Sequence, residues 1–305
     1  MASNLHLAYR RNAQAAAKNH KVRKHKDEDS LIRARDDFAF FCEYIDSKKK
    51  PAKHHLEWHQ HLVTNQDSDC LLKIAGPNLD LLASRGSAKS TILGLLAAWT
   101  IGVHTTAKKP LQILYLSYTV DIARSKSATI KRIIESKRYQ EVFPSVRLLK
   151  NVTSNEYWSI DYRFAGIENT GDEQFTLCAA GLKGSVTSKR SHLVCIDDPI
   201  KSSADISNPD IRRTMQDNWN AVIAPTMFEG GRAICLGTRF RHDDIHATTF
   251  NEQNNWRQIV LSAINNDPIT GEEQSYWPEM WSLDYLKEKK RQAPIAFSFQ
   301  YMNQI

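Results

Sequence analysis

The residues best suited to chemistry form one continuous run: Ser84, Arg85, Gly86, Ser87, Ala88, Lys89, Ser90 and Thr91. Apolar runs lie on either side, at 79–83 and 92–101. A strand, a turn of small residues, Lys-Ser/Thr and then a helix is typical of a phosphate-binding loop, because backbone N–H groups and the helix N-terminus attract an anion. Lys89 would contact the β- and γ-phosphates, and the Ser90 hydroxyl would hold Mg²⁺. A chance Lys-Ser pair at a helix start is the alternative.

Two carboxylates close a second apolar run. Residues 192–196 are followed by Asp197, Asp198 and Pro199. A continuous apolar stretch that ends at turn residues predicts a strand buried on both faces, as in a parallel α/β sheet. Ligands of such sheets bind at the carboxyl ends of the strands, where these acids would lie. Asp197 would hold Mg²⁺ through water, and Asp198 would orient or deprotonate the attacking water. A helix cap or a solvated turn is the alternative for paired acids after a strand.

A third apolar run, from Arg232 to Leu236, ends in Gly237, Thr238 and Arg239. The carboxyl ends of parallel strands meet at one edge of a sheet, so Thr238 would arrive beside the γ-phosphate. A hydroxyl there can register whether that phosphate is present. An ordinary strand-end turn is the alternative.

Taken together, these residues resemble the ATPase part of the large terminase subunit of tailed bacteriophages. The run 84–90 is similar to the arginine-containing phosphate loop of that family, and 196–200 and 236–244 resemble its second motif and its coupling motif. Residues 276–279 and 299–303 resemble the passage that joins the motor of that family to a nuclease domain. The resemblance covers roughly residues 55 to 305.

The sequence departs from the family's pattern at three positions. Glycine usually stands where this chain has Ala83 and Ala88, and many relatives carry glutamate in place of Asp198. These departures bear on the geometry of the loop and on the identity of the catalytic base.

The resemblance implies a three-layer α/β phosphate-loop ATPase of the additional-strand type with a mainly parallel central sheet. It implies ATP and Mg²⁺ as cofactors, and hydrolysis that drives double-stranded viral DNA into a procapsid. The implied partners are double-stranded DNA, the portal protein of the procapsid, the small terminase subunit and neighbours in a ring of five subunits. The implied place is the host cytoplasm, transiently at the portal. A nuclease domain would follow this chain, so we expect no DNA cleavage by the chain itself.

The resemblance also assigns further site residues. Arg85 would join Lys89 at the phosphates. Trp58 and Gln60 lie just before the first strand, where related ATPases hold the adenine with an aromatic ring and a glutamine. A packed tryptophan and a surface glutamine are the alternative at this point.

A ring motor usually completes its site with a cation from the neighbouring subunit. We expect Arg190 in this role, because it precedes the acidic strand within the polar run 183–191. Lys189 and Arg163 are alternates. The other interpretation is that Arg190 caps the strand or contacts DNA.

The composition is that of an ordinary globular protein, with 305 residues, 41% hydrophobic and 25% charged. The sequence contains no transmembrane-length apolar stretch and no apolar signal-peptide core at its start, so no membrane association is expected. Five scattered cysteines without metal-type spacing indicate buried thiols in a reducing compartment.

The positive charge is concentrated at the N-terminus. Residues 1–26 contain seven Lys or Arg and no acid, while the whole chain has 41 bases and 34 acids. Without this arm, 34 bases face 34 acids, so the net charge of +7 comes from the arm. A basic tail attracts phosphate backbones, and a solubilising terminus is the alternative.

The chain is expected to divide into a disordered basic arm (1–30), an ATPase domain (31–265) and a linker or small subdomain (266–305). Within it, apolar periodicity and turn residues predict helices at 30–45, 54–63, 90 onward, 121–136, 205–221 and 283–291, and further strands at 112–118, 157–167, 174–180 and 256–264. The helix at 121–136 is basic and could follow DNA phosphates or form a solvated face.

Two other functions compete with a packaging motor. A nucleic-acid helicase of the same ATPase superclass would need a second motor-like domain, for which too few residues remain. A DNA-binding or capsid-interaction protein with a decayed nucleotide site would not need Lys89, Ser90, Asp197 and Thr238 together.

Overall fold

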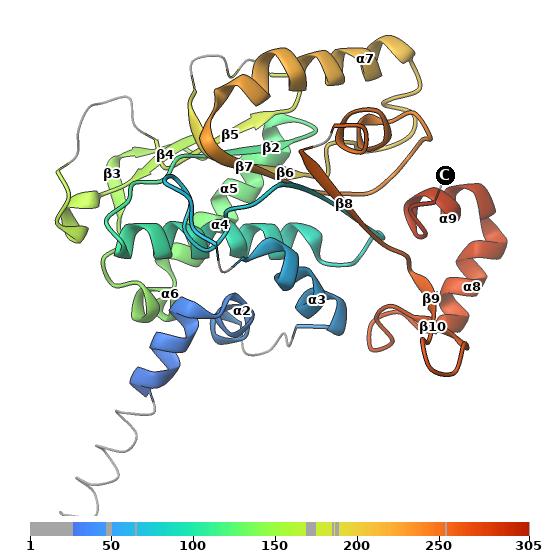
Figure 1. The fold of residues 1–305 in the computed structure, drawn as a ribbon, viewed down its shortest axis with the longest axis horizontal. Helices are drawn as coiled ribbons and strands as arrows, with labels where there is room; N and C mark the ends of the chain where they lie inside the picture. The colour runs from blue at the N-terminus through green and yellow to red at the C-terminus, as the bar shows by residue number, and fades with distance from the viewer. Residues whose placement is uncertain are drawn as a thin grey trace, which may run out of the picture.

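The computed structural model describes residues 27–46, 51–64, 66–168, 175–184, 186, 189–253 and 255–304. An eight-stranded sheet runs through it in the order β3-β4-β5-β2-β6-β7-β1-β8 (Figure 1). Its strands are β1 (Asn78–Ala83), β2 (Ile113–Ser117), β3 (Leu148–Thr153), β4 (Tyr157–Ile160), β5 (Leu177–Gly181), β6 (Ser191–Asp197), β7 (Met227–Gly237) and β8 (Trp256–Leu261). Among these described strands, the β3–β4 and β4–β5 pairs are antiparallel and the others are parallel. The mainly parallel sheet confirms the predicted α/β class.

One strand separates the two strands that lead into the predicted site. The strand before the phosphate loop, β1, pairs in parallel with β7, so that Leu82 is opposite Gly237. On its other side β7 pairs with β6, which places Leu236 opposite Asp197. A strand inserted between the phosphate-loop strand and the acidic strand is the additional-strand arrangement that the sequence predicted.

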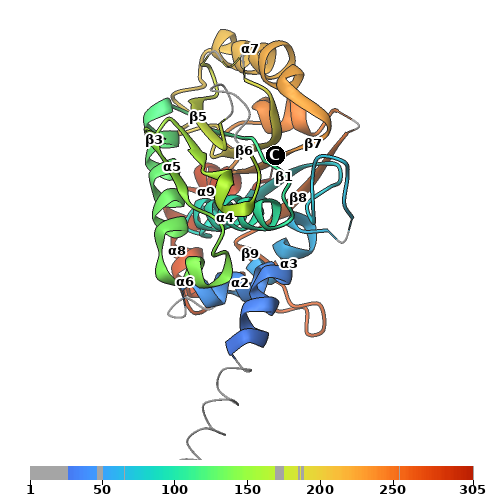
Figure 2. The ribbon, with the colours of Figure 1, turned by 90° about the vertical axis from the view of Figure 1, so that its left-hand side faces the viewer.

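Helices cover both faces of the sheet and complete three layers (Figures 1 and 2). One face carries α2 (Phe38–Ile45), α3 (Lys53–Leu62), α4 (Lys89–Thr106), α5 (Val120–Glu135) and α6 (Lys137–Val142), and the other carries α7 (Pro209–Asn218) and the π-helical turns Trp219–Ile223 and His246–Phe250. Alternate residues of each strand point to opposite faces. Leu79 and Leu81 therefore join the first apolar core, whereas Leu114 and Leu116 join the second.

Three element predictions need correction. The helix expected at 30–45 is two helices, because Asp37 leaves the helix and accepts a hydrogen bond from the Phe40 N–H at 3.0 Å, which caps α2. Residues 27–36 are already helical, so the arm predicted to end at residue 30 ends earlier. The strand expected at 157–167 stops at Ile160 and continues as a 3₁₀ helix (Tyr162–Ala165). The basic stretch 1–26 lies outside the described residues.

A small C-terminal unit lies beside β8 (Figure 1). It contains β9 (Ile264–Asn266), β10 (Glu273–Ser275), α8 (Leu283–Gln292) and α9 (Pro294–Gln300). Its apolar centre includes Tyr276, Leu286 and Phe297, separate from the two main cores. The Ala263 N–H donates to the Tyr301 carbonyl at 2.8 Å and closes the unit on itself. The domain limits given above stay predictions.

The five cysteines are free thiols, and all except Cys70 are buried. Within the described part of the chain, no helix has the length and apolar character needed to cross a membrane.

Candidate functional site

The turn between β1 and α4 has the backbone of a phosphate-binding loop. Gly86 and Ala88 have positive φ angles of 79° and 62°. Such residues tighten the turn and let successive N–H groups point toward one place. A Cβ on Gly86 would lie 2.6 Å from Cζ2 of Trp281, so only glycine fits there. Ala88 carries a Cβ in the left-handed conformation, which disfavours any residue except glycine.

Lys89 begins α4 with its side chain buried between the strand ends. Its Nζ donates to the carbonyls of Ala83 (3.2 Å) and Ser84 (3.1 Å) and lies 3.8 Å from Oδ1 of Asp198. Burial lowers the pKa of the Lys89 ammonium, while Asp198 and then Asp197 oppose that shift. An ammonium has three hydrogens, and two carbonyls leave one donor for an anion.

Asp197, at the end of β6, is the most enclosed carboxylate of the site. Its Oδ1 accepts from the Ser90 hydroxyl at 2.7 Å, and its Oδ2 accepts from the Tyr115 hydroxyl at 3.2 Å. The Lys126 Nζ lies 3.8 Å from Oδ2. Burial, followed by the charge of Asp198, raises the pKa of Asp197 to about 6. The structure thus brings together Ser90 and Asp197, the two residues predicted to hold a metal.

Asp198 differs from its neighbour in both backbone and exposure. Its φ is 45°, a left-handed conformation that aspartate tolerates better than most residues. The backbone is held by the Asp198 N–H, which donates to the Leu236 carbonyl at 3.0 Å. The side chain is 44% exposed and faces Lys89. Asp198 is therefore the acid that can reach a solvent molecule.

Thr238 follows β7 and joins the same edge of the sheet. Its hydroxyl donates to the Ala83 carbonyl at 3.2 Å, directly before the phosphate loop. A cavity of about 220 Å³ lies between these strand ends. Its lining includes Arg85, Ser90, Asp197, Asp198 and Thr238. Five residues predicted from three separate motifs therefore share one cavity.

The remaining loop residues divide between the interior and the surface. Arg85 is exposed and donates to the Lys201 carbonyl at 3.1 Å, with its guanidinium 5.5 Å from the Phe240 ring centre. Ser84 and Ser87 are buried, and Thr91 is exposed on the first turn of α4.

Two residues of the cavity were missed by sequence reasoning. Tyr115 looked like one more apolar residue of a strand, and Lys126 looked like one more cation of a basic helix. Both contact Asp197. Since α5 starts directly after β2, a side chain in its second turn can still reach the carboxyl edge of the sheet. The strand–helix order was the available signal.

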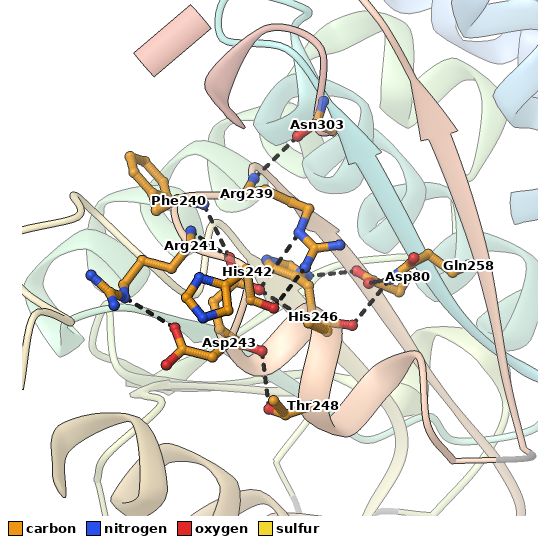
Figure 3. Close-up of polar contacts among 12 residues, drawn as sticks. Asp80, Arg239, Phe240, Arg241, His242, Asp243, His246, Thr248, Gln258 and Asn303 are labelled. Carbon is orange, nitrogen blue, oxygen red and sulfur yellow. Dashed lines mark hydrogen bonds and ion pairs between the residues drawn. The ribbon is translucent and has the colours of Figure 1, made fainter. Parts of the chain in front are cut away.

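The segment after Thr238 is fixed by buried polar contacts (Figure 3). The Asp244 carboxylate accepts from the N–H groups of Phe240 (3.0 Å) and Arg241 (3.2 Å). The Arg239 N–H donates to Oδ1 of Asn303 at 3.1 Å. This segment therefore connects the site to the C-terminal unit.

A second set of contacts connects the same segment to β1 and β8 (Figure 3). Nδ1 of His246 lies 2.9 Å from Oδ1 of Asp80, and Gln258 donates to Oδ2 of Asp80 at 2.8 Å. A Cβ on Gly237 would lie 2.4 Å from Cε1 of His246, so glycine is required for this packing. The end of β7 is thus held in place from both sides.

The two residues predicted to hold adenine lie apart from the cavity. Trp58 is only 2% exposed and packs against His54 and His55 at ring distances of 4.9 and 5.4 Å. Gln60 is exposed and lines a different hollow, next to Asp37. In this conformation the tryptophan ring has no free face for a base, which matches the packed alternative.

Arg190 lies at the opposite end of β6 from Asp197. Seven strand residues separate the two ends by about 20 Å, so Arg190 cannot reach the cavity of its own chain. It donates to the Pro225 carbonyl at 3.3 Å and lies over the Phe228 ring. Its action on a neighbouring subunit stays a prediction. The alternates are also engaged, Lys189 over the Tyr157 ring and Arg163 with Asp161 at 2.6 Å.

A larger hollow of about 1210 Å³ lies at the β3 edge of the sheet, away from the strand-end acids. Its basic lining consists of Lys131, Arg147, Lys150 and Arg163, and Phe164 beside them is 63% exposed. It also contains Glu135 and Asp161. The basic helix α5 therefore divides its cations, with Lys126 in the small cavity and Lys131 in this hollow.

By its sheet order and its loop, the chain has an α/β phosphate-loop fold of the additional-strand type. No protein-family model matches the sequence, and no curated protein matches it. Among solved structures, it is similar to the large terminase ATPase domain of Thermus phage P74-26, at 16% identity and a TM-score of 0.46, over 82% of this chain and 97% of that chain.

Two further solved structures are similar to the chain. One is the large terminase of another thermophilic bacteriophage, at 8% identity and a TM-score of 0.47, over 83% of this chain and 53% of that chain. The other is the genome packaging motor assembly of bacteriophage Phi-29, at 16% identity and a TM-score of 0.37, over 73% of this chain and 60% of that chain. Large terminases are the family that the sequence motifs resemble. At such low identity, the activity has to be inferred from the residues of this chain's own site.

Proposed function

We propose that this chain is an ATPase whose hydrolysis of ATP drives the movement of double-stranded viral DNA into a procapsid. One observation carries the proposal. The Ser90 hydroxyl and the Asp197 carboxylate, predicted from motifs 107 residues apart, lie 2.7 Å apart. Lys89 and Asp198 lie beside them. Hydroxyl, carboxylate and ammonium groups in this grouping suit a metal–phosphate ligand better than they suit packing.

The donor set fits Mg²⁺ and a phosphate chain. Mg²⁺ prefers hard oxygen ligands and binds through one or two protein groups, with waters and phosphates completing the shell. Ser90 and Asp197 would supply those groups. The Ser87 hydroxyl is buried and has no hydrogen-bond partner among the described residues, so a phosphate oxygen is a fitting acceptor. The cavity of about 220 Å³ is smaller than the roughly 300–1,000 Å³ of pockets that enclose whole ligands. It therefore suits the phosphates, with the base outside.

Phosphoryl transfer requires positioning and charge stabilisation more than covalent chemistry. Mg²⁺, when bound, neutralises charge on the β- and γ-phosphates. Lys89 would direct its free hydrogen to the same oxygens, and Arg85 would turn from the Lys201 carbonyl to reach them. Both cations are present before the ligand arrives, so little rearrangement is needed at the moment of reaction.

Asp198 would hold the attacking water and accept its proton. Its partial exposure gives it access to water, and its 3.8 Å approach to Lys89 favours the ionised form that can act as a base. Thr238 would donate to the γ-phosphate and exchange that bond for the Ala83 carbonyl after phosphate release. Because Arg239 is bonded to Asn303, a shift at Thr238 would be carried into the C-terminal unit.

Coupling to DNA rests on the motif resemblance and on charge. The cations at the β3 edge hollow, Lys131, Arg147, Lys150 and Arg163, would contact duplex phosphates, together with the basic stretch 1–26. We propose that the chain works in a ring of five copies at the portal protein, with the small terminase subunit as a further partner, in the host cytoplasm. Arg190 of one copy would complete the site of the next.

The test is phosphate release from ATP with and without linear duplex DNA, next to strand separation on a forked duplex. A packaging motor should be stimulated by duplex DNA and should leave the strands paired. Lys89→Ala is the control that removes chemistry from the same preparation. ATP-dependent strand separation would favour the helicase alternative. DNA binding without any hydrolysis would indicate a decayed site.

A further inference from the structure

Two histidines of α3 converge on one carbonyl of the phosphate loop. Nε2 of His55 lies 2.9 Å from the Ser87 carbonyl oxygen, and Nε2 of His54 lies 3.3 Å from it. Both rings are almost fully buried, at 4% and 2% exposed. Ser87 is the residue directly before Ala88, so these contacts act on the most strained point of the loop.

The hydrogen bonds of His55 determine which ring nitrogen carries the proton. Its Nδ1 accepts from the Ala52 N–H at 3.0 Å, in the first turn of α3. A nitrogen that accepts carries no hydrogen, so the neutral ring has its proton on Nε2 and donates to Ser87. Burial lowers the pKa of His55, which keeps the ring neutral near pH 7. His55 is therefore a fixed donor to the loop.

Fixing the Ser87 carbonyl also fixes the Ala88 N–H. The peptide between them is trans, and the C=O and N–H of a trans peptide point in opposite directions. With the carbonyl directed at α3, the Ala88 N–H points away from α3. If that peptide turned over, Ala88 would leave its left-handed conformation (φ 62°, ψ 23°), which a residue with a Cβ does not favour by itself.

We propose that His55, with His54 beside it, is a positioning residue that holds the Ser87–Ala88 peptide in the phosphate-binding orientation. In doing so it offsets the presence of alanine where the loop geometry favours glycine. The role deepens the proposed nucleotide site and rests on it for the identity of the ligand, whereas the loop conformation itself is a property of the free protein.

The C-terminal unit completes the enclosure of this pair. The His54 ring packs against Tyr276 and Trp277 at 5.0 and 5.2 Å, and the His55 ring packs against Trp277 at 5.2 Å. Aromatic cover keeps water from competing for the Ser87 carbonyl, which strengthens the hydrogen bond. The loop is thus held by α3, and α3 is held by the C-terminal unit.

The test uses two amides of different reach in the full chain. His55→Gln places an amide nitrogen near the position of Nε2 and can still donate to Ser87. His55→Asn reaches only the position of Nδ1 and leaves the carbonyl without that donor. The matched control is His59→Asn, one turn further along α3, where a buried ring (7% exposed) has no hydrogen-bond partner among the described residues.

The measured quantity is the dissociation constant for a non-hydrolysable ATP analogue with Mg²⁺, on variants whose melting curves show them folded. His55→Asn should weaken binding about tenfold, the effect of one hydrogen bond lost from a buried carbonyl. His55→Gln and His59→Asn should stay within about threefold of the parent, less than half the effect of that bond. Equal loss in both His55 variants, or no loss in His55→Asn, would overturn the proposal.

A double-mutant cycle with Ala88→Gly tests the compensation itself. Glycine adopts the left-handed conformation without help, so His55→Asn should lose only about threefold when Ala88→Gly is present. The same loss in both backgrounds would show that the histidine does not act through Ala88.

A crystal structure of the free His55→Asn chain separates this inference from the proposed function. Reorientation of the Ser87 carbonyl would support the positioning role even if the chain bound no nucleotide at all. An unchanged carbonyl in the free variant would contradict the role, whatever the fate of the ATPase proposal.

Discussion

Two buried cations lie at opposite ends of the sheet, and their surroundings differ. Arg232, near the amino ends of the strands, is 2% exposed, and Lys89, at the carboxyl ends, is 5% exposed. The Arg232 guanidinium donates to four fixed carbonyls, those of Pro77 (2.8 Å), Leu62 (3.0 Å), Ile74 (3.0 Å) and His61 (2.9 Å). Lys89 has two longer bonds to carbonyls and faces a carboxylate across the cavity.

This difference separates a structural cation from a binding cation. A planar guanidinium saturated by backbone oxygens has no donor left for a ligand and ties together the segments that precede β1. An ammonium with a spare hydrogen beside two acids has been buried without being satisfied, which proteins tolerate mainly where a ligand completes the site. The two ends should therefore respond to mutation in different quantities, stability at one and chemistry at the other.

The largest effect on stability is expected from Arg232→Met. Four buried carbonyls would lose their donor, which should lower the free energy of unfolding by about 3–5 kcal/mol. Chemical denaturation measures this directly. Arg232→Lys should recover only part of the loss, because an ammonium cannot reach four carbonyls at once. A loss below about 1 kcal/mol for the methionine variant would remove the structural role.

Asp197→Asn should stabilise the free protein in a pH-dependent way. The pKa of Asp197 is about 6 in the fold and about 3.9 in an unfolded chain. For an acid whose pKa is raised by folding, the stability cost appears as pH rises from about 4 to about 6 and is constant above that. Asparagine avoids the cost, so the variant should be more stable by about 2–3 kcal/mol at pH 8 and about equal to the parent at pH 4.

The measurement is the free energy of unfolding at both pH values, without nucleotide or metal. Asp198→Asn is the control, since its side chain is 44% exposed and should change stability less. Destabilisation by Asp197→Asn at pH 8 would mean that its hydrogen bonds to Ser90 and Tyr115 outweigh its burial.

Lys126→Gln should reduce kcat/KM for ATP about tenfold without DNA, the loss of one charged contact in the cavity. Its Nζ lies 3.8 Å from Asp197 and lines the cavity, so it would add charge near the phosphates. Arg132→Gln is the control, an exposed cation on the same helix. If both variants lost the same activity, Lys126 would belong to the general basic face of α5 and not to the site.

The smallest effect is expected within the loop itself. Ala88→Gly removes a Cβ from a left-handed residue and should raise stability by about 0.5–1 kcal/mol, after the entropy that glycine adds to the unfolded chain. Gly86→Ala should act in the opposite direction, because the new Cβ would meet Trp281 at 2.6 Å. Melting temperatures of the two variants check the pair, and a shift of the same sign in both would contradict the loop geometry.

The sequence predicted the parts that depend on local order. Apolar runs that end in Ser84, Asp197 and Thr238 could be recognised as buried parallel strands, and parallel strands end at one edge, so their final residues had to meet. Apolar periodicity also placed α3, α4 and α5 within one or two residues of their observed bounds.

What the sequence could not supply are contacts between distant segments. Nothing in the spacing of His54 and His55 indicated that they meet the Ser87 carbonyl, because that depends on how α3 packs across β1. The approach of Trp281 to Gly86 depends in the same way on where the C-terminal unit lies. The polar run around Arg190 was placed by its neighbours in sequence, although a strand carries its two ends about 20 Å apart.

The most direct test of the central claim is the steady-state release of phosphate from ATP by the purified chain and by Lys89→Ala, at saturating Mg²⁺. Loss of one preorganised charge contact typically costs about 3–4 kcal/mol of activation free energy. Lys89→Ala should therefore be slower by about 10²–10³-fold while its melting temperature stays close to that of the parent. Equal rates for the two proteins, or no phosphate release by either, would contradict the assignment of this cavity as an ATPase site.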